Sequence, residues 1–107
     1  MQVTSPERKA SVRPSVALQA HRQKVRDIVS VHGATNPRVF GAVAWGDDTS
    51  ESDFDLLIDP TAETTLFDIG AIRHELLLLL GVTVEVLTPN ALPTRFRDSV
   101  LAEAIPV

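Results

Sequence analysis

Apolar positions recur along much of the chain at intervals of three or four residues, the period of a helix that buries one face. This pattern predicts helices between residues 14 and 33, between residues 64 and 81, and over about residues 92–104. The first two segments open with residues that favour a helix N-terminus and close with a glycine, which suits a C-terminal cap. The expected boundary residues are Pro14, with Ser15 as the N-cap, Gly33, Thr64 or Thr65, and Gly81.

Three shorter segments have the composition or the alternation of strands, namely residues 38–44, 53–58 and 82–87. The predicted order of elements is therefore α-β-β-α-β-α. Residues 1–13 show no apolar period, and we expect them to be a flexible leader before a single domain over residues 14–107. The turn-forming residues that separate the elements are Asn36 with Pro37, the polar residues 45–52, and Asp59 with Pro60.

The connections predict how the strands pair. The second strand, the second helix and the third strand form a crossover unit, which places those two strands parallel with a right-handed connection. Only about eight residues join the first two strands, and a connection this short suits antiparallel pairing. The expected fold class is α+β, a small mixed sheet with helices packed on it.

The composition narrows the classes of function. A formal net charge of −4 and few aromatic residues argue against direct nucleic-acid binding, which favours a basic surface and stacking side chains. The longest apolar run, Leu76–Leu80, is far shorter than the roughly 20 residues of a membrane span, and we expect it to divide between core and partner-facing surface. The start of the sequence has no apolar signal-peptide core, so a cytoplasmic location is expected.

Two carboxylates stand out at the start of the second predicted strand. Successive side chains of a strand point to opposite faces, so Asp53 and Asp55 share one face, about 7 Å apart along the strand. Phe54, Leu56 and Ile58 face the other way, into a core. Like charges held this close repel each other unless a cation lies between them, and hard oxygen ligands suit Mg²⁺. The pair is therefore a candidate metal site.

Further features flank this pair. Gly41 and Gly46 come before it, and glycines at a strand end let backbone N–H groups approach a phosphate. Glu85 lies on the third predicted strand and faces the two aspartates if the strands are neighbours in suitable register. Taken alone, each feature has a simpler interpretation: a solvated turn, a hairpin, an exposed strand residue. Together, three acids around one or two Mg²⁺ ions indicate phosphoryl or nucleotidyl transfer.

The stretch from Gly41 to Ile58 reads GAVAWGDDTSESDFDLLI. It resembles the signature of the minimal nucleotidyltransferases of the DNA polymerase beta superfamily, and the resemblance extends from Leu18 to the end of the chain. It implies that Asp53, Asp55 and Glu85 are catalytic and hold Mg²⁺. The residues implied to bind the nucleotide are Gly41, Ala42, Gly46 and Ser52.

Members of that family are usually antitoxins paired with a HEPN-type toxin. The resemblance implies Mg²⁺-dependent transfer of AMP from ATP onto a toxin tyrosine, which silences the toxin's ribonuclease activity, within a hetero-oligomer. Three residues depart from the family pattern: Ala42 stands for Ser, Trp45 for a frequent Arg, and Glu85 for Asp. These departures leave open an antitoxin that acts by binding alone. Transfer to RNA or to a small molecule is a further alternative.

Other candidate residues have weaker signals. The three histidines show no metal-binding spacing and are expected at helix surfaces or ends. Trp45 is expected to anchor a partner, because Trp is enriched among interface hot spots. The three histidines are His21, His32 and His74. Arg95 and Arg97 either contact a triphosphate or an acidic partner or, as the favoured interpretation, lie on a solvated helix face.

Overall fold

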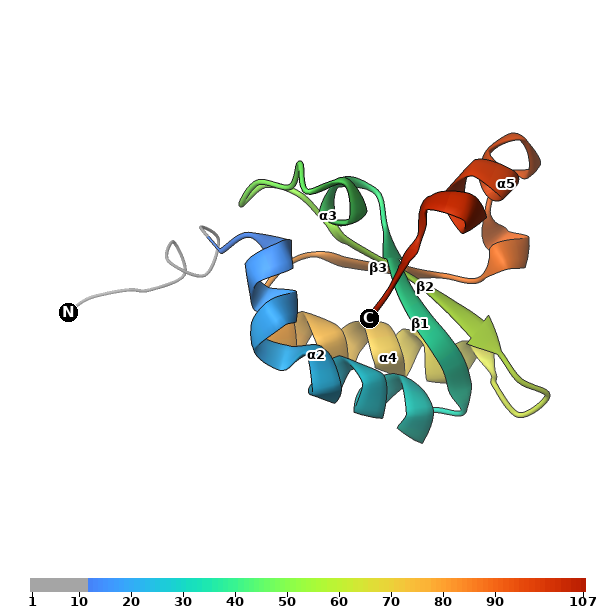
Figure 1. Ribbon diagram of the computed structural model, residues 1–107. Helices are drawn as coiled ribbons and strands as arrows, with labels where there is room; N and C mark the ends of the chain where they lie inside the picture. The colour runs from blue at the N-terminus through green and yellow to red at the C-terminus, as the bar shows by residue number, and fades with distance from the viewer. Residues whose placement is uncertain (1–11) are drawn as a thin grey trace.

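The computed structural model describes residues 12–107 (Figure 1). Most of the expected leader, residues 1–11, lies outside the described residues, whereas Arg13 belongs to the folded domain, as shown below. The elements follow the chain in the order α2 (Pro14–Val31), β1 (Ala34–Phe40), α3 (Ala42–Trp45), β2 (Phe54–Pro60), α4 (Leu66–Leu80), β3 (Val84–Leu87), the 3-10 helix η1 (Pro89–Ala91), α5 (Thr94–Glu103) and β4 (Ile105–Pro106).

The strands form one mixed sheet in the order β3-β2-β1-β4. β1 pairs antiparallel with β2, and β2 pairs parallel with β3, so both predicted pairings are confirmed. The fourth strand, β4, was not predicted. It has only two residues, Ile105 and Pro106, which pair with Val39 and Arg38 of β1. A segment this short carries no periodicity, so only its pairing with β1 makes it a strand.

Helices α2 and α4 lie side by side and cover one face of the sheet (Figure 1). Phe54, Leu56 and Ile58 of β2 point into this layer and have no exposed surface, as the alternation predicted. Leu57 is also fully buried, on the opposite face, where η1 contacts β2. The buried residues of α2 and α4 in the main core are Ala17, Leu18, Val25, Val29, Ile72, Leu76 and Leu80.

The first predicted strand, residues 38–44, is wrong at both ends. β1 begins earlier, at Ala34, because Asn36 and Pro37 form an irregularity within the strand and not a turn before it; Asn36 has a φ of 54°. It ends at Phe40, because Gly41 has a φ of 71°, outside the range of a strand. The residues after Gly41 form the short helix α3 instead. Similarly, β2 does not stop at Ile58 but continues to Pro60.

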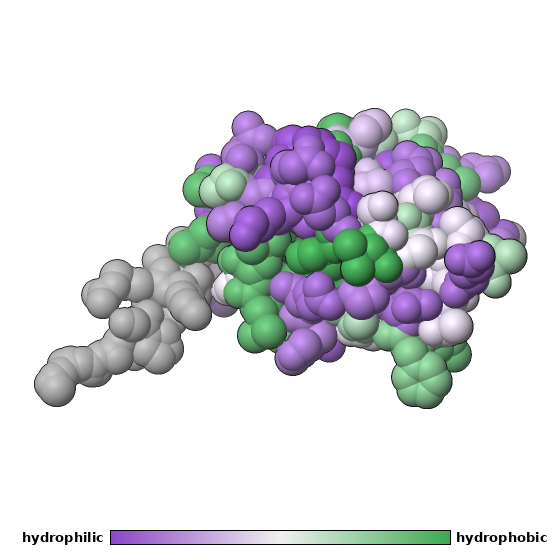
Figure 2. All heavy atoms as spheres, turned by 90° about the horizontal axis from the view of Figure 1, so that it is seen from below, coloured by the Kyte–Doolittle hydropathy of each residue, from purple (hydrophilic) through white to green (hydrophobic). Residues whose placement is uncertain are grey.

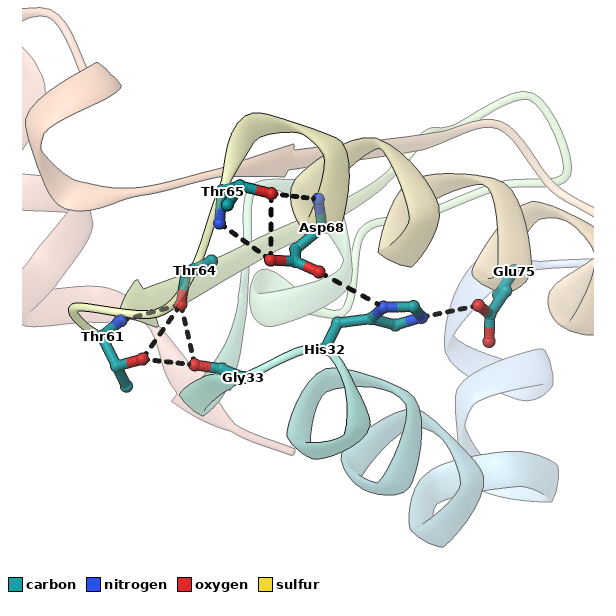
Figure 3. A network of polar contacts seen from close by, with 7 residues as sticks. All are labelled: His32, Gly33, Thr61, Thr64, Thr65, Asp68 and Glu75. Atoms are coloured by element: carbon teal, nitrogen blue, oxygen red, sulfur yellow. Dashed lines mark hydrogen bonds and ion pairs between the residues drawn. The ribbon is translucent and has the colours of Figure 1, made fainter.

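The end of α2 and the start of α4 are joined by polar contacts, shown in Figure 3. Thr65 is the N-cap of α4 and forms a capping box with Asp68, which confirms one of the two predicted caps. His32, the C-cap of α2, contacts a carboxylate oxygen of Asp68 at 3.7 Å and one of Glu75 at 2.6 Å. His32 thus lies at a helix end, as predicted, and connects the two helices that carry the core.

The predicted N-cap of α2 is wrong. The helix begins at Pro14 with Arg13 in the cap position, and neither Arg13 nor Ser15 caps it with its own side chain. The backbone N–H of Ser15 donates instead to Asp48, which comes from the loop before β2. A side chain from a distant part of the sequence therefore does the work that was assigned to a local one.

The leucine run is divided as predicted between the core and the surface. Leu76 and Leu80 are buried, whereas the side chain of Leu78 is 69% exposed. Figure 2 views the molecule from the side of α2 and α4 and shows an apolar strip between hydrophilic side chains. A groove of about 450 Å³ lies here, lined by Lys24, Asp27, Ile28, Glu75, Leu78 and Leu79. Among the described residues, no helix is long and apolar enough to cross a membrane.

Candidate active site

The candidate site lies on the face of the sheet that α2 and α4 leave uncovered. Parallel pairing of β2 with β3 aligns Asp55 with Glu85, so the two acids are register neighbours. Asp53 directly precedes β2, two positions before Asp55 and therefore on the same face. Asp55 is half-buried, while Asp53 and Glu85 are exposed. The condition under which Glu85 was expected to face the two aspartates is therefore met, because β2 and β3 are neighbours in this register.

Asp55 is the electrostatic centre of this group. Burial, followed by the negative charges of Glu85 and Asp53, raises the pKa of its carboxyl to about 6. Within residues 12–107 no hydrogen bond to this carboxylate offsets the cost. An ionised Asp55 is therefore held in an unfavourable environment, which a bound cation would relieve.

Gly41 makes room for this carboxylate. A Cβ atom at this position would overlap the Oδ2 atom of Asp55, and the φ of 71° is one that residues with side chains rarely adopt. The backbone of Gly41 therefore passes directly against the acid, at the start of α3. Gly46, in the left-handed conformation, ends α3 five residues after Gly41. The two glycines thus shape a tight connection beside Asp55.

The other two residues of the predicted nucleotide site also lie between β1 and β2, Ala42 in α3 and Ser52 in the loop that follows it. Ala42 is the first residue of α3 and is partly buried. The Ser52 hydroxyl accepts a hydrogen bond of 2.9 Å from the backbone N–H of Thr49, and the Ser52 N–H donates to the Thr49 carbonyl at 3.0 Å. Ser52 therefore holds together the turn that leads into Asp53.

The three acids do not form a closed set of ligands by themselves. Over residues 12–107 no three His, Cys, Asp or Glu side chains are grouped closely enough to hold a metal ion. What the structure contains is one pair in register, Asp55 and Glu85, with Asp53 next to it. Such an open arrangement suits Mg²⁺, which binds through one or two carboxylates and takes its remaining ligands from water and phosphate.

The structure also shows the surroundings of Arg97 and Trp45, two residues that the sequence singled out. Arg97 does not lie on a solvated face. Its guanidinium donates to the carbonyls of Pro89 at 2.9 Å, Asn90 at 3.3 Å and Leu92 at 3.1 Å, and so ties α5 to η1. Trp45, at the end of α3, is 63% exposed.

Asp48 was not among the residues predicted from the sequence. This residue lies between Gly46 and Asp53, and its side chain has no exposed surface. It pairs with Arg13, 35 positions away. No local pattern could have revealed it, because an acid in a polar loop is usually solvated.

The nucleotidyltransferase domain family matches residues 18–107, nearly the whole described chain. The chain therefore belongs to the nucleotidyltransferase domain family and is a nucleotidyltransferase. The match begins within α2 and includes every element of the sheet, the glycine connection and all three acids.

Individual relatives show which nucleotidyltransferases the chain is similar to. The chain is 31% identical over 86 residues to a Methanocaldococcus jannaschii protein named "putative protein adenylyltransferase", covering 80% of this chain and 92% of that one. It is 40% identical to a solved "putative minimal nucleotidyltransferase", with a TM-score of 0.79 over 87% of this chain and 95% of that chain. The chain is thus similar to minimal nucleotidyltransferases along almost its full length.

Two solved toxin–antitoxin complexes share the fold. One contains AMP-PNP and matches with a TM-score of 0.67 at 14% identity, over 78% of this chain and 69% of that chain. The other is a mutant of MntA–HpeT, with a TM-score of 0.62 at 12% identity, over 80% and 69% of the two chains. At these identities the likeness establishes the common architecture.

Proposed function

We propose that this chain transfers AMP from ATP, with Mg²⁺, to a tyrosine hydroxyl of a HEPN-type ribonuclease toxin and acts as the antitoxin of that toxin. The observation that carries the proposal is the placement of Asp55 beside Glu85, with Gly41 packed against the Asp55 carboxylate. The relative named as a protein adenylyltransferase supports a protein acceptor. The toxin–antitoxin complexes of the same fold support a toxin as that protein.

Asp53, Asp55 and Glu85 are the residues that would hold Mg²⁺. When bound, the ion would neutralise charge on the triphosphate and favour ionisation of the acceptor hydroxyl. The acceptor oxygen then forms a bond to the α-phosphorus of ATP while the bond to pyrophosphate breaks, and the hydroxyl proton is released. The role of Gly41 is to let the backbone that precedes α3 lie against Asp55 without a side chain in between.

Exposed apolar side chains support a protein partner. Leu66 and Phe67 open α4 with 85% and 91% of their surfaces exposed, and Val31 ends α2 with 79% exposed. Exposed apolar groups of this size often mark a protein–protein contact. We expect the cognate toxin to cover part of this surface in a hetero-oligomer.

A second candidate function is neutralisation by binding alone. It is favoured by the absence, within residues 12–107, of a grouped set of three metal-binding side chains. Ala42 also lacks a hydroxyl that could contact a phosphate. Under this alternative the exposed apolar surface remains essential, whereas Asp53 and Asp55 can be replaced without loss of toxin neutralisation.

The test is to incubate the chain with its co-expressed toxin, Mg²⁺ and ATP labelled at the α-phosphate, and to measure label and mass increase on the toxin. We expect one or more AMP groups on the toxin and no transfer with EDTA. Asp53→Asn with Asp55→Asn should abolish transfer while the circular dichroism spectrum stays that of the wild type. Glu85→Asp and Ala42→Ser should leave transfer intact or improve it.

The outcomes separate the candidates. Neutralisation of the toxin without any AMP transfer by the wild type would overturn the enzyme proposal in favour of binding alone. Labelling of an added RNA or small molecule, with the toxin unlabelled, would instead identify a different acceptor.

A further inference from the structure

Asp48 is a fully buried acid in a surface connection, between α3 and β2. Its Oδ2 atom accepts a hydrogen bond of 2.8 Å from the backbone N–H of Ser15. Its Oδ1 atom accepts one of 3.1 Å from the guanidinium of Arg13, whose Nε atom also donates to the Asp48 backbone carbonyl at 3.1 Å. Three hydrogen bonds therefore attach this one residue to the start of α2.

These contacts stabilise both the N-terminus of α2 and the buried carboxylate of Asp48. Pro14 has no N–H, so the Ser15 N–H is the first free donor at the N-terminus of α2, and the helix has no side-chain cap of its own. A carboxylate at this end of a helix is stabilised by the helix dipole. Burial alone would raise the pKa of Asp48, but the hydrogen bonds from Ser15 and Arg13 and the Arg13 charge outweigh it and hold the pKa below its usual value.

Asp48 is also the residue through which residues 46–53, the connection between α3 and β2, are attached to α2. The turn at residues 49–52 closes on itself through Thr49 and Ser52. Every other residue from 46 to 53 is exposed or only partly buried. Beyond the turn, the Phe54 N–H donates a hydrogen bond of 2.8 Å to the carbonyl of Thr83, the residue before β3. The Asp47 N–H also donates to the Ala42 carbonyl of α3 at 3.0 Å, but within residues 46–53 it is Asp48 whose hydrogen bonds attach the connection to α2.

We propose that Asp48 is a positioning residue for nucleotide binding: its attachment to Arg13 and Ser15 sets the path of residues 46–53 and so places Asp53 beside Asp55 and Glu85. This inference rests on the proposed function, since it assumes that these acids receive ATP with Mg²⁺. Asp48 lies with its carboxylate toward α2 and does not itself face the acids. Its effect on the site is indirect, through the backbone of the connection.

The test compares the binding of Mg²⁺ and ATP by Asp48→Ala and by the wild type, both as full chains. Trp45 is the sole tryptophan and ends α3 just before the connection, so its fluorescence reports binding, with calorimetry as a second measurement. We expect Asp48→Ala to weaken ATP affinity about tenfold, because small displacements of binding groups cost this much or more. Hydrogen exchange should accelerate at the N–H groups of residues 47–52 and stay unchanged in β2.

Three further variants separate positioning from general destabilisation. Asp47→Ala removes the neighbouring, exposed acid and should bind ATP as the wild type does. Asp48→Asn keeps an acceptor for Ser15 and should recover part of the affinity lost in Asp48→Ala. Arg13→Gln leaves Asp48 in place but removes its charged partner; it should weaken binding less, and it carries the test if Asp48→Ala does not fold.

The results distinguish this inference from the proposed function. If the wild type binds no ATP with Mg²⁺, the proposed function and this inference both fail. If the wild type binds, and Asp48→Ala binds equally well while folded, only the positioning role is overturned. The same holds if Asp47→Ala weakens binding as much as Asp48→Ala, because the effect would then be one of charge.

Discussion

On the face of the sheet that α2 and α4 cover, Phe54, Leu56 and Ile58 have no exposed surface. On the opposite face of the same strand, Asp55 is half-buried, lies beside another acid and has a raised pKa. Two positions along from Asp55, Leu57 on this second face is again fully buried. The difference shows that the second face is not uniformly exposed to solvent: it is closed around Leu57 and more open around Asp55 and Glu85.

The apolar face supplies the stability that lets the other face keep repelling charges. Burying a large aliphatic side chain contributes about 1.5–3 kcal/mol, whereas a domain of this kind is stable by only about 5–15 kcal/mol in all. A site whose charges repel each other in the absence of a ligand persists only because the packed apolar face stabilises the fold. Substitutions on the two faces should therefore change the free energy of unfolding by different amounts. Substitutions on the apolar face should lower it, whereas neutralising an acid should raise it.

The largest effect is expected on the apolar face. Leu56→Ala should lower the free energy of unfolding by about 2–5 kcal/mol, because the fully buried side chain leaves a cavity. Urea denaturation measures the loss. Leu78→Ala, which truncates an exposed leucine of α4, is the control and should change stability by less than about 0.5 kcal/mol. Equal losses of unfolding free energy in both variants would contradict the conclusion that the buried apolar face supplies the stability.

An intermediate effect is expected where the open face meets α3. Gly41→Ala should cost about 1–3 kcal/mol, because the residue would be strained at a φ of 71° and its Cβ atom would press on Asp55. Gly70→Ala is the matched control. Gly70 lies within α4 with open space at its Cβ position, so alanine should raise stability by about 0.5–1 kcal/mol. A thermal unfolding series in which both variants lose stability would refute this account of Gly41.

The smallest effect is expected at the acids themselves. Because the folded-state pKa of Asp55 is raised to about 6 from 3.8, its contribution favours the folded state below about pH 4 and is lost as the pH rises through 6. In metal-free buffer, Asp55→Asn should remove this decline and slightly raise the unfolding temperature at pH 7. Asp98→Asn, on an exposed part of α5, controls for the charge. A wild-type profile that rises steadily from pH 4 to pH 7, with no difference in Asp55→Asn, would argue against a strained Asp55.

Much of the candidate site could be predicted because it depends on neighbouring residues. Strand alternation placed Asp53 and Asp55 on one face and Phe54 on the other, and the structure agrees. Whether Glu85 would join them could not be decided, because a one-residue shift in register would have turned it to the other face. The pairing of Asp55 with Glu85 settles that question.

Features whose partners lie within a few residues can be derived from the amino-acid sequence alone. The capping box of Thr65 with Asp68, the helix end at Gly81 and the crossover from β2 through α4 to β3 all depend on local geometry. Hydrogen bonds between near neighbours follow from short spacings, and these can be recognised in a single chain.

Features whose partners are distant in the sequence depend on how the whole chain folds. Asp48 caps α2 from 33 positions away, in place of the expected Ser15, and the two residues of β4 form a strand only because β1 presents an edge to them. The physical reason is the same in both cases. A buried carboxylate and a two-residue strand are unfavourable in isolation, and they are stabilised only when the folded chain brings donors to them.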